Sequence, residues 1–241
     1  MGQSWSRLQQ KKNAKSLLEL APKKTPGQDE PLEELDRGAL LASLKAVAAY
    51  ITKKKGNVTV IAVGGAVNTI YLQSRTSTHD VDFFNNRLTP AAFKLIVEGA
   101  AAAAKANPKL DAEWFNNRTI LFIPRDQRDT LTEQSYAQNE IIFQEPGLTV
   151  LAAPWQYAFC CKVDRVAGGG IQAARPYDVP DAVNYLRRYL SRQGKTQVPL
   201  ATVKEWFTQY SLRWTANCDI VVAQVNAGYK KLFKVTYNAI A

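Results

Sequence analysis

The sequence predicts an α/β (α+β) fold, in which a small mixed sheet is flanked by helices and followed by a helical C-terminal region. Three observations predict this class. Residues 58–63 (VTVIAV) form a short apolar, β-branched run, which is typical of a buried strand. Residues 80–83 (DVDF) alternate polar and apolar side chains, as in a strand with one buried face. From residue 154 onwards, apolar residues recur at helical spacing.

The chain is long enough, at 241 residues, to bury a sizeable core, and its formal net charge is +10. Residues 1–55 hold 11 Lys and Arg against 6 Asp and Glu, and residues 183–241 hold 9 against 2. Basic ends around an acidic centre favour an anionic partner, such as a nucleotide, RNA, DNA or an acidic membrane surface. Ordinary solubilising charge explains any single basic residue equally well.

Several features bear on the compartment. The sequence has no run of eighteen apolar residues and no secretory signal at its start, so we expect an intracellular, cytoplasmic protein. Cys160, Cys161 and Cys218 are odd in number and lack metal-binding spacing, so we expect reduced thiols.

Residues 1–27 are expected to form a flexible, basic N-terminal tail. Their first six residues, MGQSWS, fit the pattern for myristoylation of Gly2, and several lysines follow. One acyl chain binds membranes weakly, and a polybasic segment is the usual second signal. Peripheral attachment to a membrane surface through Gly2 and these lysines is therefore an alternative to a free basic tail.

Residues 28–153 are expected to form the α/β domain. A helix is predicted over residues 31–54, because its leucines form an apolar stripe, acidic residues follow Pro31 and lysines precede Gly56. Further along the chain, the pattern predicts a helix over 89–107 capped by Thr89, a strand over 118–123 and a β-hairpin over 140–151. Residues 125–139 are charged and irregular in pattern, which leaves a short helix or a surface loop open.

Residues 154–241 are expected to form the helical C-terminal region. Its predicted helices cover residues 154–166, 180–191, 200–211 and 219–233. Its aromatic residues stand at core-like spacing, which favours packing over stacking on nucleic-acid bases: Tyr185, Tyr189, Trp206, Phe207, Tyr210 and Trp214.

Gly64 and Gly65 end the strand over residues 58–63, and residues 66–73 then have helical spacing. Two glycines adopt backbone angles that other residues avoid, and they let a ligand approach the main chain closely. Free N–H groups where a strand gives way to a helix form a natural phosphate site. We therefore predict that Gly64, Gly65 and Asn68 hold phosphates.

Asp80 and Asp82 are predicted to lie on one face of their strand, while Val81 and Phe83 point into the core. Two neighbouring carboxylates repel each other unless a cation or a donor lies between them. Hard oxygen ligands suit magnesium, which also binds phosphate oxygens. The pattern therefore predicts a site for a nucleoside triphosphate and Mg²⁺, whereas the plainer alternative is a β-α-β unit with a surface Asp-x-Asp edge.

The Gly64-Gly65 pair, the fourteen-residue gap and Asp80-Val-Asp82 together resemble the motif of the nucleotidyltransferase superfamily, in its small, minimal branch. The resemblance covers about residues 40–190. It implies a nucleotidyltransferase-like sheet in which Asp80 and Asp82 bind two metals, and a nucleotidyl group passes from the triphosphate to a hydroxyl acceptor. The acceptor could be RNA or tRNA, another nucleic acid, a protein or a small molecule.

The resemblance also implies a third carboxylate, which completes the metal site and acts as the base. The predicted strand over 118–123 carries no acid. In small family members a Trp-x-Asn-acid sequence precedes this strand and is similar to Trp114-Phe-Asn116-Asn117. The resemblance thus implies that Asn117 stands at the position of the acid. Asparagine can coordinate a metal but cannot serve as a base, which puts catalysis in doubt. The nearby acids are Asp111, Glu113, Asp126 and Glu140, of which Glu113 and Glu140 are the candidates to replace it.

Two further features resemble the family. Lys162-x-x-Arg165 and the following Asp178-x-x-Asp181 are similar to its lysine helix, which implies that Lys162 contacts phosphate; a structural ion pair between two helices is the alternative. Arg75 stands where family members have an arginine that shapes the turn and reaches the phosphates.

Two hypotheses follow from this sequence. In the first, the protein is a magnesium-dependent nucleotidyltransferase. In the second, it is a catalytically inactive binding or scaffold protein with the same fold, associated with membranes through its N-terminus. The missing third acid favours the second hypothesis.

Overall fold

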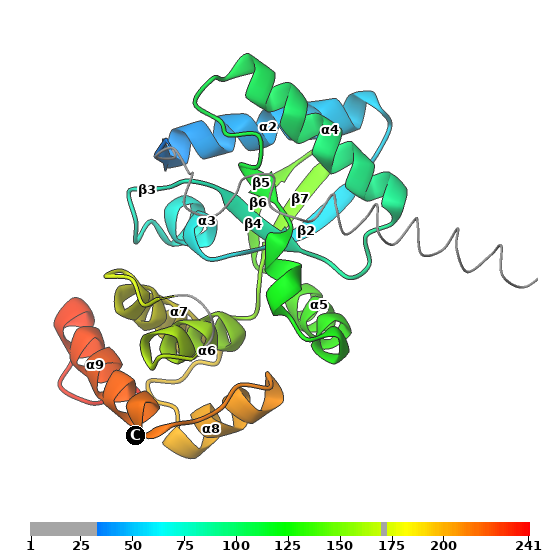
Figure 1. Ribbon diagram of the computed structural model, residues 1–241. Helices are drawn as coiled ribbons and strands as arrows, with labels where there is room; N and C mark the ends of the chain where they lie inside the picture. Colours follow the sequence, from blue (N-terminus) through cyan, green and yellow to red (C-terminus); the bar gives the residue numbers. More distant parts are fainter. Residues whose placement is uncertain (1–32, 170–172) are drawn as a thin grey trace, which may run out of the picture.

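The computed structural model describes residues 33–169 and 173–241 (Figure 1). The expected tail over residues 1–27, with Gly2 and its lysines, lies outside these ranges. Within them the predicted mixed α/β class is confirmed: a five-stranded mixed sheet and a two-stranded sheet are accompanied by helices. None of the helices in the described part of the chain is both long and apolar enough to cross a membrane.

The five-stranded sheet has the order β5-β4-β2-β7-β6. Its central strand β2 is antiparallel to β4 and parallel to β7, and the two outer pairs are β4 with β5, parallel, and β6 with β7, antiparallel. The hairpin predicted over 140–151 is confirmed as β6 and β7. The bounds of the strands are Val58–Val63 for β2, Val81–Phe84 for β4, Phe115–Asn116 for β5, Ile141–Glu145 for β6 and Leu148–Ala152 for β7.

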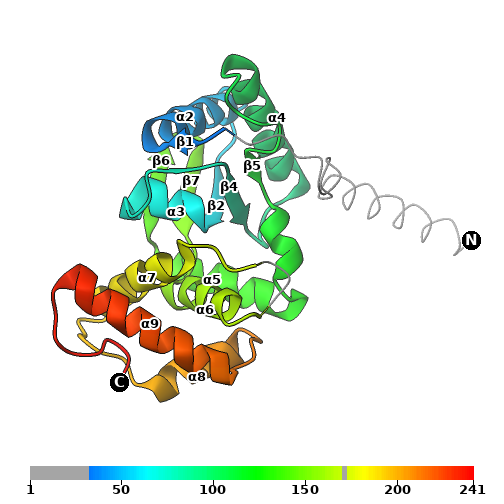
Figure 2. The same cartoon turned by 60° about the vertical axis from the view of Figure 1, so that its left-hand side comes forward.

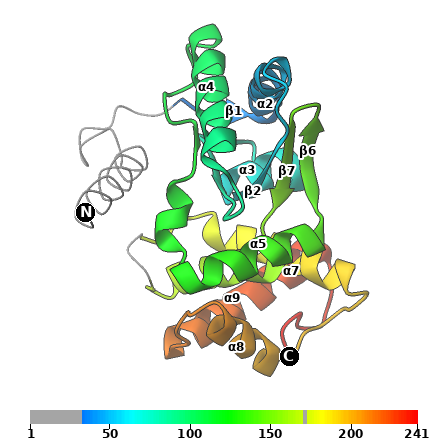
Figure 3. The same ribbon diagram turned by 90° about the vertical axis from the view of Figure 1, so that its right-hand side faces the viewer.

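Helices α2 (Arg37–Lys53) and α4 (Pro90–Ala106) lie side by side on one side of the sheet (Figures 1 and 3). The predicted cap of α4 is confirmed, because Thr89 accepts a hydrogen bond from the backbone N–H of Ala92. The first helix was predicted to begin too early, because residues 33–36 are not helical and α2 begins at Arg37. Asp36 caps α2 by accepting from the backbone N–H of Ala39.

The short strand β1 (Leu35–Asp36) precedes α2 and pairs with β3 (Ser77–Thr78). The leucine at position 35 is buried, so its place in the apolar stripe reflects a strand rather than the first turn of a helix. This small sheet brings the start of the described chain beside the segment that leads into β4.

The strand predicted over residues 118–123 was also wrong, since η2 (Arg118–Phe122) is a 3₁₀ helix. Only the two residues of β5 pair with β4, at the edge of the sheet. Arg128 donates from its guanidinium to the carbonyls of Ile120 and Ile123, which therefore need no neighbouring strand. Of the two alternatives for residues 125–139, the short helix is correct: the segment folds as η3 (Arg125–Gln127) and the helix α5 (Arg128–Gln138).

The C-terminal helices lie on the side of the molecule away from α2 and α4 (Figures 2 and 3). They are α6 (Trp155–Val166), α7 (Asp178–Arg192), α8 (Leu200–Gln209) and α9 (Ala216–Phe233). The predicted helices over 154–233 are confirmed within a few residues. The aromatic residues expected in the core are mostly buried there, including Tyr185, Trp206, Phe207 and Tyr210.

Candidate functional site

Three neighbouring strands bring the candidate residues together. Asp82 on β4 lies opposite Val63, the last residue of β2, and opposite Asn116 on β5. Gly64 and Gly65, which we call the glycine turn, directly follow Val63. The register therefore brings the glycine turn, Asp82 and Asn116 together at one end of the neighbouring strands β2, β4 and β5.

Asp80 and Asp82, which we call the acid pair, both remain partly exposed, whereas Val81 and Phe83 are buried. The predicted alternation of side chains is thus confirmed. The amide of Asn116 donates to Asp80 Oδ2 at 3.4 Å. The two carboxylates and this amide therefore form one polar cluster on the same face.

The electrostatics of the acid pair are unfavourable for two negative charges. Burial, and then the charge of Asp80, raise the pKa of Asp82 to about 7, although Arg118 and the amide of Asn116 act in the opposite direction. Burial also raises the pKa of Asp80. Within the described residues, the acid pair is therefore only partly neutralised by protein groups.

The residue opposite Asp82 on the neighbouring strand β5 is an asparagine. In the register of β5 against β4, the residue beside Asp82 is Asn116 rather than Asn117. Asn116 accepts at Oδ1 from the backbone N–H of Arg118 and donates to the carbonyl oxygen of Glu113. The sequence comparison pointed to Asn117, whereas the residue opposite Asp82 is Asn116.

The acids considered as replacements lie elsewhere or are engaged. Glu113 pairs with Arg118 at 3.3 Å. Asp126 is exposed on η3. Glu140 is buried against α7, where it accepts hydrogen bonds from Tyr71, Trp155, Arg188 and Arg192. In residues 33–169 and 173–241, no three His, Cys, Asp or Glu side chains are grouped so that they could hold a metal ion.

The two glycines of the turn are required for different reasons. Gly64 has φ +65° and ψ −134°, a conformation that L-residues rarely adopt, and a Cβ at this position would meet no atom within 4 Å. A Cβ on Gly65 would lie 2.1 Å from Thr78 Oγ1, so packing against β3 requires this glycine. Only Gly64 therefore borders open space.

Asn68 holds the turn from inside. It is fully buried, and its Nδ2 donates to the carbonyl oxygen of Gly64 at 3.0 Å and to Tyr185 Oη at 2.5 Å. Its Oδ1 accepts from the hydroxyl of Ser74. The helix predicted over 66–73 is α3 (Gly65–Val67) continued by the π-helix η1 (Asn68–Leu72). The amide of Asn68 is thus used to shape the glycine turn instead of facing a ligand.

Lys162 and Arg75, the two cations expected to contact phosphate, both bind aspartates of α7. Lys162 is buried, with Nζ 2.7 Å from Asp178 Oδ1 and 2.9 Å from Asp181 Oδ2. Arg75 donates from Nε to Asp181 Oδ1 at 2.9 Å and from Nη2 to Asp181 Oδ2. Burial raises the pKa of Asp178, but Lys162, the backbone N–H of Arg175 and the charge of Arg165 together outweigh burial and lower the pKa below its usual value. The alternative interpretation of Lys162, a structural ion pair, describes this arrangement.

One face of α7 holds the segment that contains the glycine turn. Asp181 binds Arg75, the hydroxyl of Tyr185 donates to the carbonyl of Gly64, and Arg188 donates to the hydroxyl of Tyr71. Figure 2 shows α7 beneath α3. The C-terminal helices therefore position the turn from outside the α/β domain.

Sequence reasoning missed the roles of Asn116, Arg118 and Tyr185. The place of Asn116 beside Asp82 depends on the register of β5 against β4, which the sequence alone does not give. The contact of Tyr185 with Gly64 likewise joins residues 121 positions apart and left no local signal.

The donor set of the site fits one magnesium ion. Two incompletely neutralised carboxylates are the protein ligands that magnesium usually takes, and phosphate oxygens and waters complete its shell. Asp80 and Asp82 would hold the ion, with Asn116 beside them. The expected second metal would need a further carboxylate, which the described residues do not group with the acid pair.

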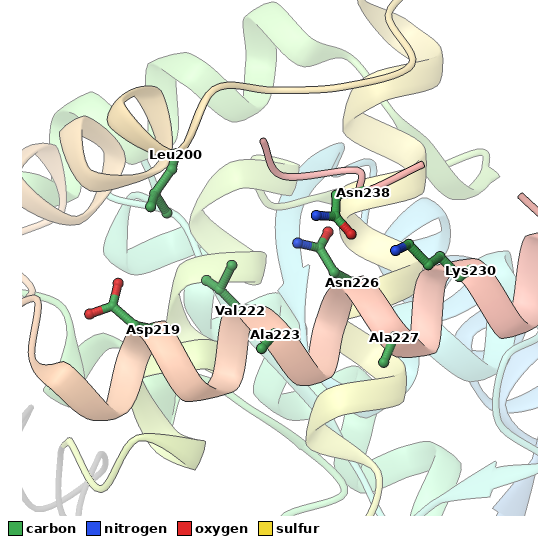
Figure 4. Close-up of a pocket in the computed structure, with 8 residues that line it drawn as sticks. All are labelled: Leu200, Asp219, Val222, Ala223, Asn226, Ala227, Lys230 and Asn238. Atoms are coloured by element: carbon green, nitrogen blue, oxygen red, sulfur yellow. The ribbon is translucent and has the colours of Figure 1, made fainter. Parts of the chain in front are cut away.

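A groove of about 390 Å³ lies along α9, away from these residues (Figure 4). Asn226 in its floor is committed to the chain end, since its amide exchanges hydrogen bonds with the backbone of Ile240. None of the candidate residues lines this groove, whose walls are Leu200, Asp219, Val222, Ala223, Asn226, Ala227, Lys230 and Asn238.

Fold and site together define a mixed α/β protein with a carboxylate pair beside a glycine turn at the edge of its main sheet. The chain belongs to the family described as "Domain of unknown function (DUF7582)", whose model matches residues 33–236. No curated protein and no solved structure matches it.

Proposed function

We propose that this protein binds a nucleoside triphosphate with magnesium at the acid pair, and that it is a nucleotidyltransferase-like binding protein without efficient transfer activity. The observation that carries the proposal is the register that aligns Gly64, Asp82 and Asn116. A backbone turn that borders open space next to two partly neutralised carboxylates suits a ligand that brings both phosphate and a cation.

The residues divide into ligand-facing and positioning groups. Asp80 and Asp82 bind the cation, and the main chain at Gly64 borders the phosphates. Asn68 and Tyr185 keep the turn in its conformation through their hydrogen bonds to the Gly64 carbonyl. Magnesium, when bound, neutralises the acid pair and shields the negative charge of the phosphates.

The donor set argues against efficient transfer. Attack by an acceptor hydroxyl needs a group that takes its proton, and Asn116 cannot do so, because an amide has no basic lone pair at neutral pH. The binding or scaffold hypothesis is therefore the one that the site supports best.

The test is thermal unfolding with ATP, CTP, GTP or UTP, each with magnesium or with EDTA. A ligand that binds only the folded state raises the melting temperature by mass action. We expect a rise with at least one nucleotide, its loss in EDTA, and its loss in Asp80→Asn. Asp126→Asn, which removes an exposed acid from η3, is the matched control and should respond like the wild type. The proposal fails if no nucleotide stabilises the protein or if Asp80→Asn responds equally.

Nucleotidyl transfer is the second candidate, and Glu113 is the observation that favours it. This acid lies beside Asn116, whose amide donates to its carbonyl, and its carboxylate is held by Arg118. Exchange of that partner for a second metal would supply a third acid. Transfer would appear as magnesium-dependent release of pyrophosphate with RNA or tRNA as acceptor, and it should disappear in Glu113→Gln while nucleotide binding remains.

We place the protein in the cytoplasm, because Cys160, Cys161 and Cys218 are free thiols, which a reducing compartment preserves. Membrane attachment through Gly2 is a separate proposal about residues outside the described ranges. It predicts flotation of the full chain with vesicles rich in anionic lipid after expression in cells, and loss of flotation in Gly2→Ala.

A further inference from the structure

The last turn of α9 gathers three lysines around an exposed leucine. Lys230 and Lys231 precede Leu232, which is 54% exposed, and Lys234 follows it. Lys234 ends the helix in the left-handed conformation, with φ +53°, so the chain changes direction at this point. Figures 1 and 2 show this turn at the margin of the molecule, on the side away from α2 and α4.

Arg187 of the neighbouring helix α7 adds a fourth cation to this turn. Its Nη1 donates to Tyr229 Oη at 3.2 Å, and its guanidinium lies over the ring of Phe233, 5.1 Å from Cζ to the ring centroid. The side chain of Arg187 is nevertheless exposed. We define the basic end of α9 as Arg187, Lys230, Lys231, Leu232 and Lys234.

The cations of the basic end form no ion pair with a carboxylate in the part of the chain that the structure describes. Residues 183–241 contain two acids, Glu205 on α8 and Asp219 in the first turn of α9. Asp219 and Lys231 are about 18 Å apart along the helix axis, which exceeds the Debye length of about 8 Å at physiological ionic strength. The negative end of the helix dipole favours lysines in the last turn, but it explains neither the arginine on α7 nor the exposed leucine.

The apolar centre of the basic end favours a membrane surface over a nucleic acid. Both partners are polyanions, so the four cations alone do not distinguish them. A phosphate backbone gains little from an exposed leucine, whereas an anionic bilayer takes up an apolar side chain that lies between basic ones. Ile220 is also exposed on α9, but its neighbours in that helix carry no cation, and single exposed apolar residues are common on protein surfaces.

We propose that the basic end of α9 docks on a membrane surface rich in anionic lipid. Its cations contact the headgroups, and Leu232 enters the boundary between headgroups and acyl chains. This attachment is peripheral and weakens as the salt concentration rises, because exposed charges are screened. It requires neither nucleotide binding nor an acyl chain on Gly2, since it uses side chains of α7 and α9.

The experiment measures flotation of the full chain with phosphatidylcholine vesicles, with and without phosphatidylserine. Every protein carries Gly2→Ala, so no acyl chain contributes to binding. The first variant is the double substitution Lys231→Gln and Lys234→Gln. Its matched control, Lys105→Gln with Lys109→Gln, removes the same charge from exposed positions at the end of α4 and just beyond it.

The charge variants should differ on vesicles that contain phosphatidylserine. We expect the double variant in the basic end to bind about 10-fold to 30-fold more weakly than its parent, because each cation near an anionic surface contributes about fivefold. The control pair on the α4 side should bind within about twofold of the parent, since those charges face away from the docked surface.

A second pair of variants tests the apolar contact without changing the charge. Leu232→Ser should weaken binding by about threefold to tenfold, because the bilayer no longer buries an apolar side chain. Val97→Ser is the matched control, since Val97 of α4 is similarly exposed at 50%, and it should bind like the parent. The melting temperatures of all four variants should equal that of the parent, because the substituted side chains are exposed.

Three results would overturn the proposal: no flotation of the parent with phosphatidylserine vesicles, equal losses in the two double variants, or unchanged binding by Leu232→Ser. The same proteins are also titrated with a single-stranded oligouridine RNA. Binding of this RNA that is lost in the basic-end variant, without flotation of the parent, would assign the surface to nucleic acid and refute membrane docking. None of these results bears on the proposed function, which the thermal unfolding with nucleotides tests separately.

Discussion

Replacing Asp82 by asparagine should make the metal-free protein more stable at pH 8 and remove much of the pH dependence of its stability. The folded protein holds the pKa of Asp82 at about 7, against a usual value of 3.8. Because the folded pKa is raised, the folded state binds more protons than the unfolded chain between about pH 4 and pH 7. The stabilising contribution of the protonated group is therefore complete below about pH 4 and is lost as the pH rises through 7.

The difference between the two pKa values corresponds to at most about 4 kcal/mol. Part of this figure is lost to solvent screening, since Asp82 remains partly exposed. We expect Asp82→Asn to raise the free energy of unfolding at pH 8 by about 1–4 kcal/mol. At pH 5, which lies between the two pKa values, only part of this difference has developed, so the gain should be clearly smaller than at pH 8. Asparagine has nearly the same shape, and the buried faces of Val81 and Phe83 lie on the other side of the strand, so the packing of the core is kept.

The assay is urea-induced unfolding in EDTA at pH 5 and pH 8 for wild type, Asp82→Asn and Asp126→Asn. The exposed acid at position 126 is the control, and its variant should follow the wild-type pH profile. Equal stability of Asp82→Asn and wild type at pH 8 would show that the acid pair is well neutralised by Arg118 and other groups, and would refute the reasoning. Magnesium should stabilise the wild type at pH 8 and leave Asp82→Asn almost unchanged if the acid pair binds the ion.

Three further substitutions test the support of the site, each by urea unfolding. Gly64→Ala should cost about 1–3 kcal/mol through its strained backbone alone, since the added methyl meets open space; unchanged stability would contradict the positive φ. Lys162→Met should cost about 3–5 kcal/mol, because two buried aspartates lose a shared partner, whereas a neutral result would mean that Arg75 compensates. Tyr185→Phe should cost about 1–3 kcal/mol and weaken nucleotide binding, since Asn68 and the Gly64 carbonyl lose its hydroxyl; loss of neither would make the contact incidental.

Local sequence pattern predicts those parts of the fold that depend on a single helix, strand or turn. The strand over 58–63, the glycine turn and the alternation around Asp82 follow from apolar runs and from period-two spacing, and all three are present. The cap of α4 likewise depends only on Thr89 and its neighbours. The sequence therefore predicted strands β2 and β4, the glycine turn after β2 and the exposed face of β4 that carries the acid pair.

The errors arose where tertiary contacts override local pattern. Residues 118–123 have the composition of a strand, but β5 ends the sheet and Arg128 satisfies carbonyls that a further strand would have paired. The register in which β5 pairs with β4 also places Asn116, rather than Asn117, beside Asp82. Strand register of this kind is set by neighbouring elements, so a single sequence does not determine it.

Local pattern also could not predict the ion pairs of Arg75 and Lys162, because they depend on contacts between distant parts of the chain. Arg75 and Asp181 are 106 positions apart, and Gly64 and Tyr185 are 121 positions apart. Asp181, Tyr185 and Arg188 recur at spacings of four and three residues, which places them on one face of α7. Through this face α7 binds Arg75 and the carbonyl of Gly64, and Lys162 of α6 binds the same Asp181, so neither cation is available to a ligand. Because Asp178 and Asp181 of α7 bind Lys162 and Arg75, these two cations are committed to α7 and not to the acid pair.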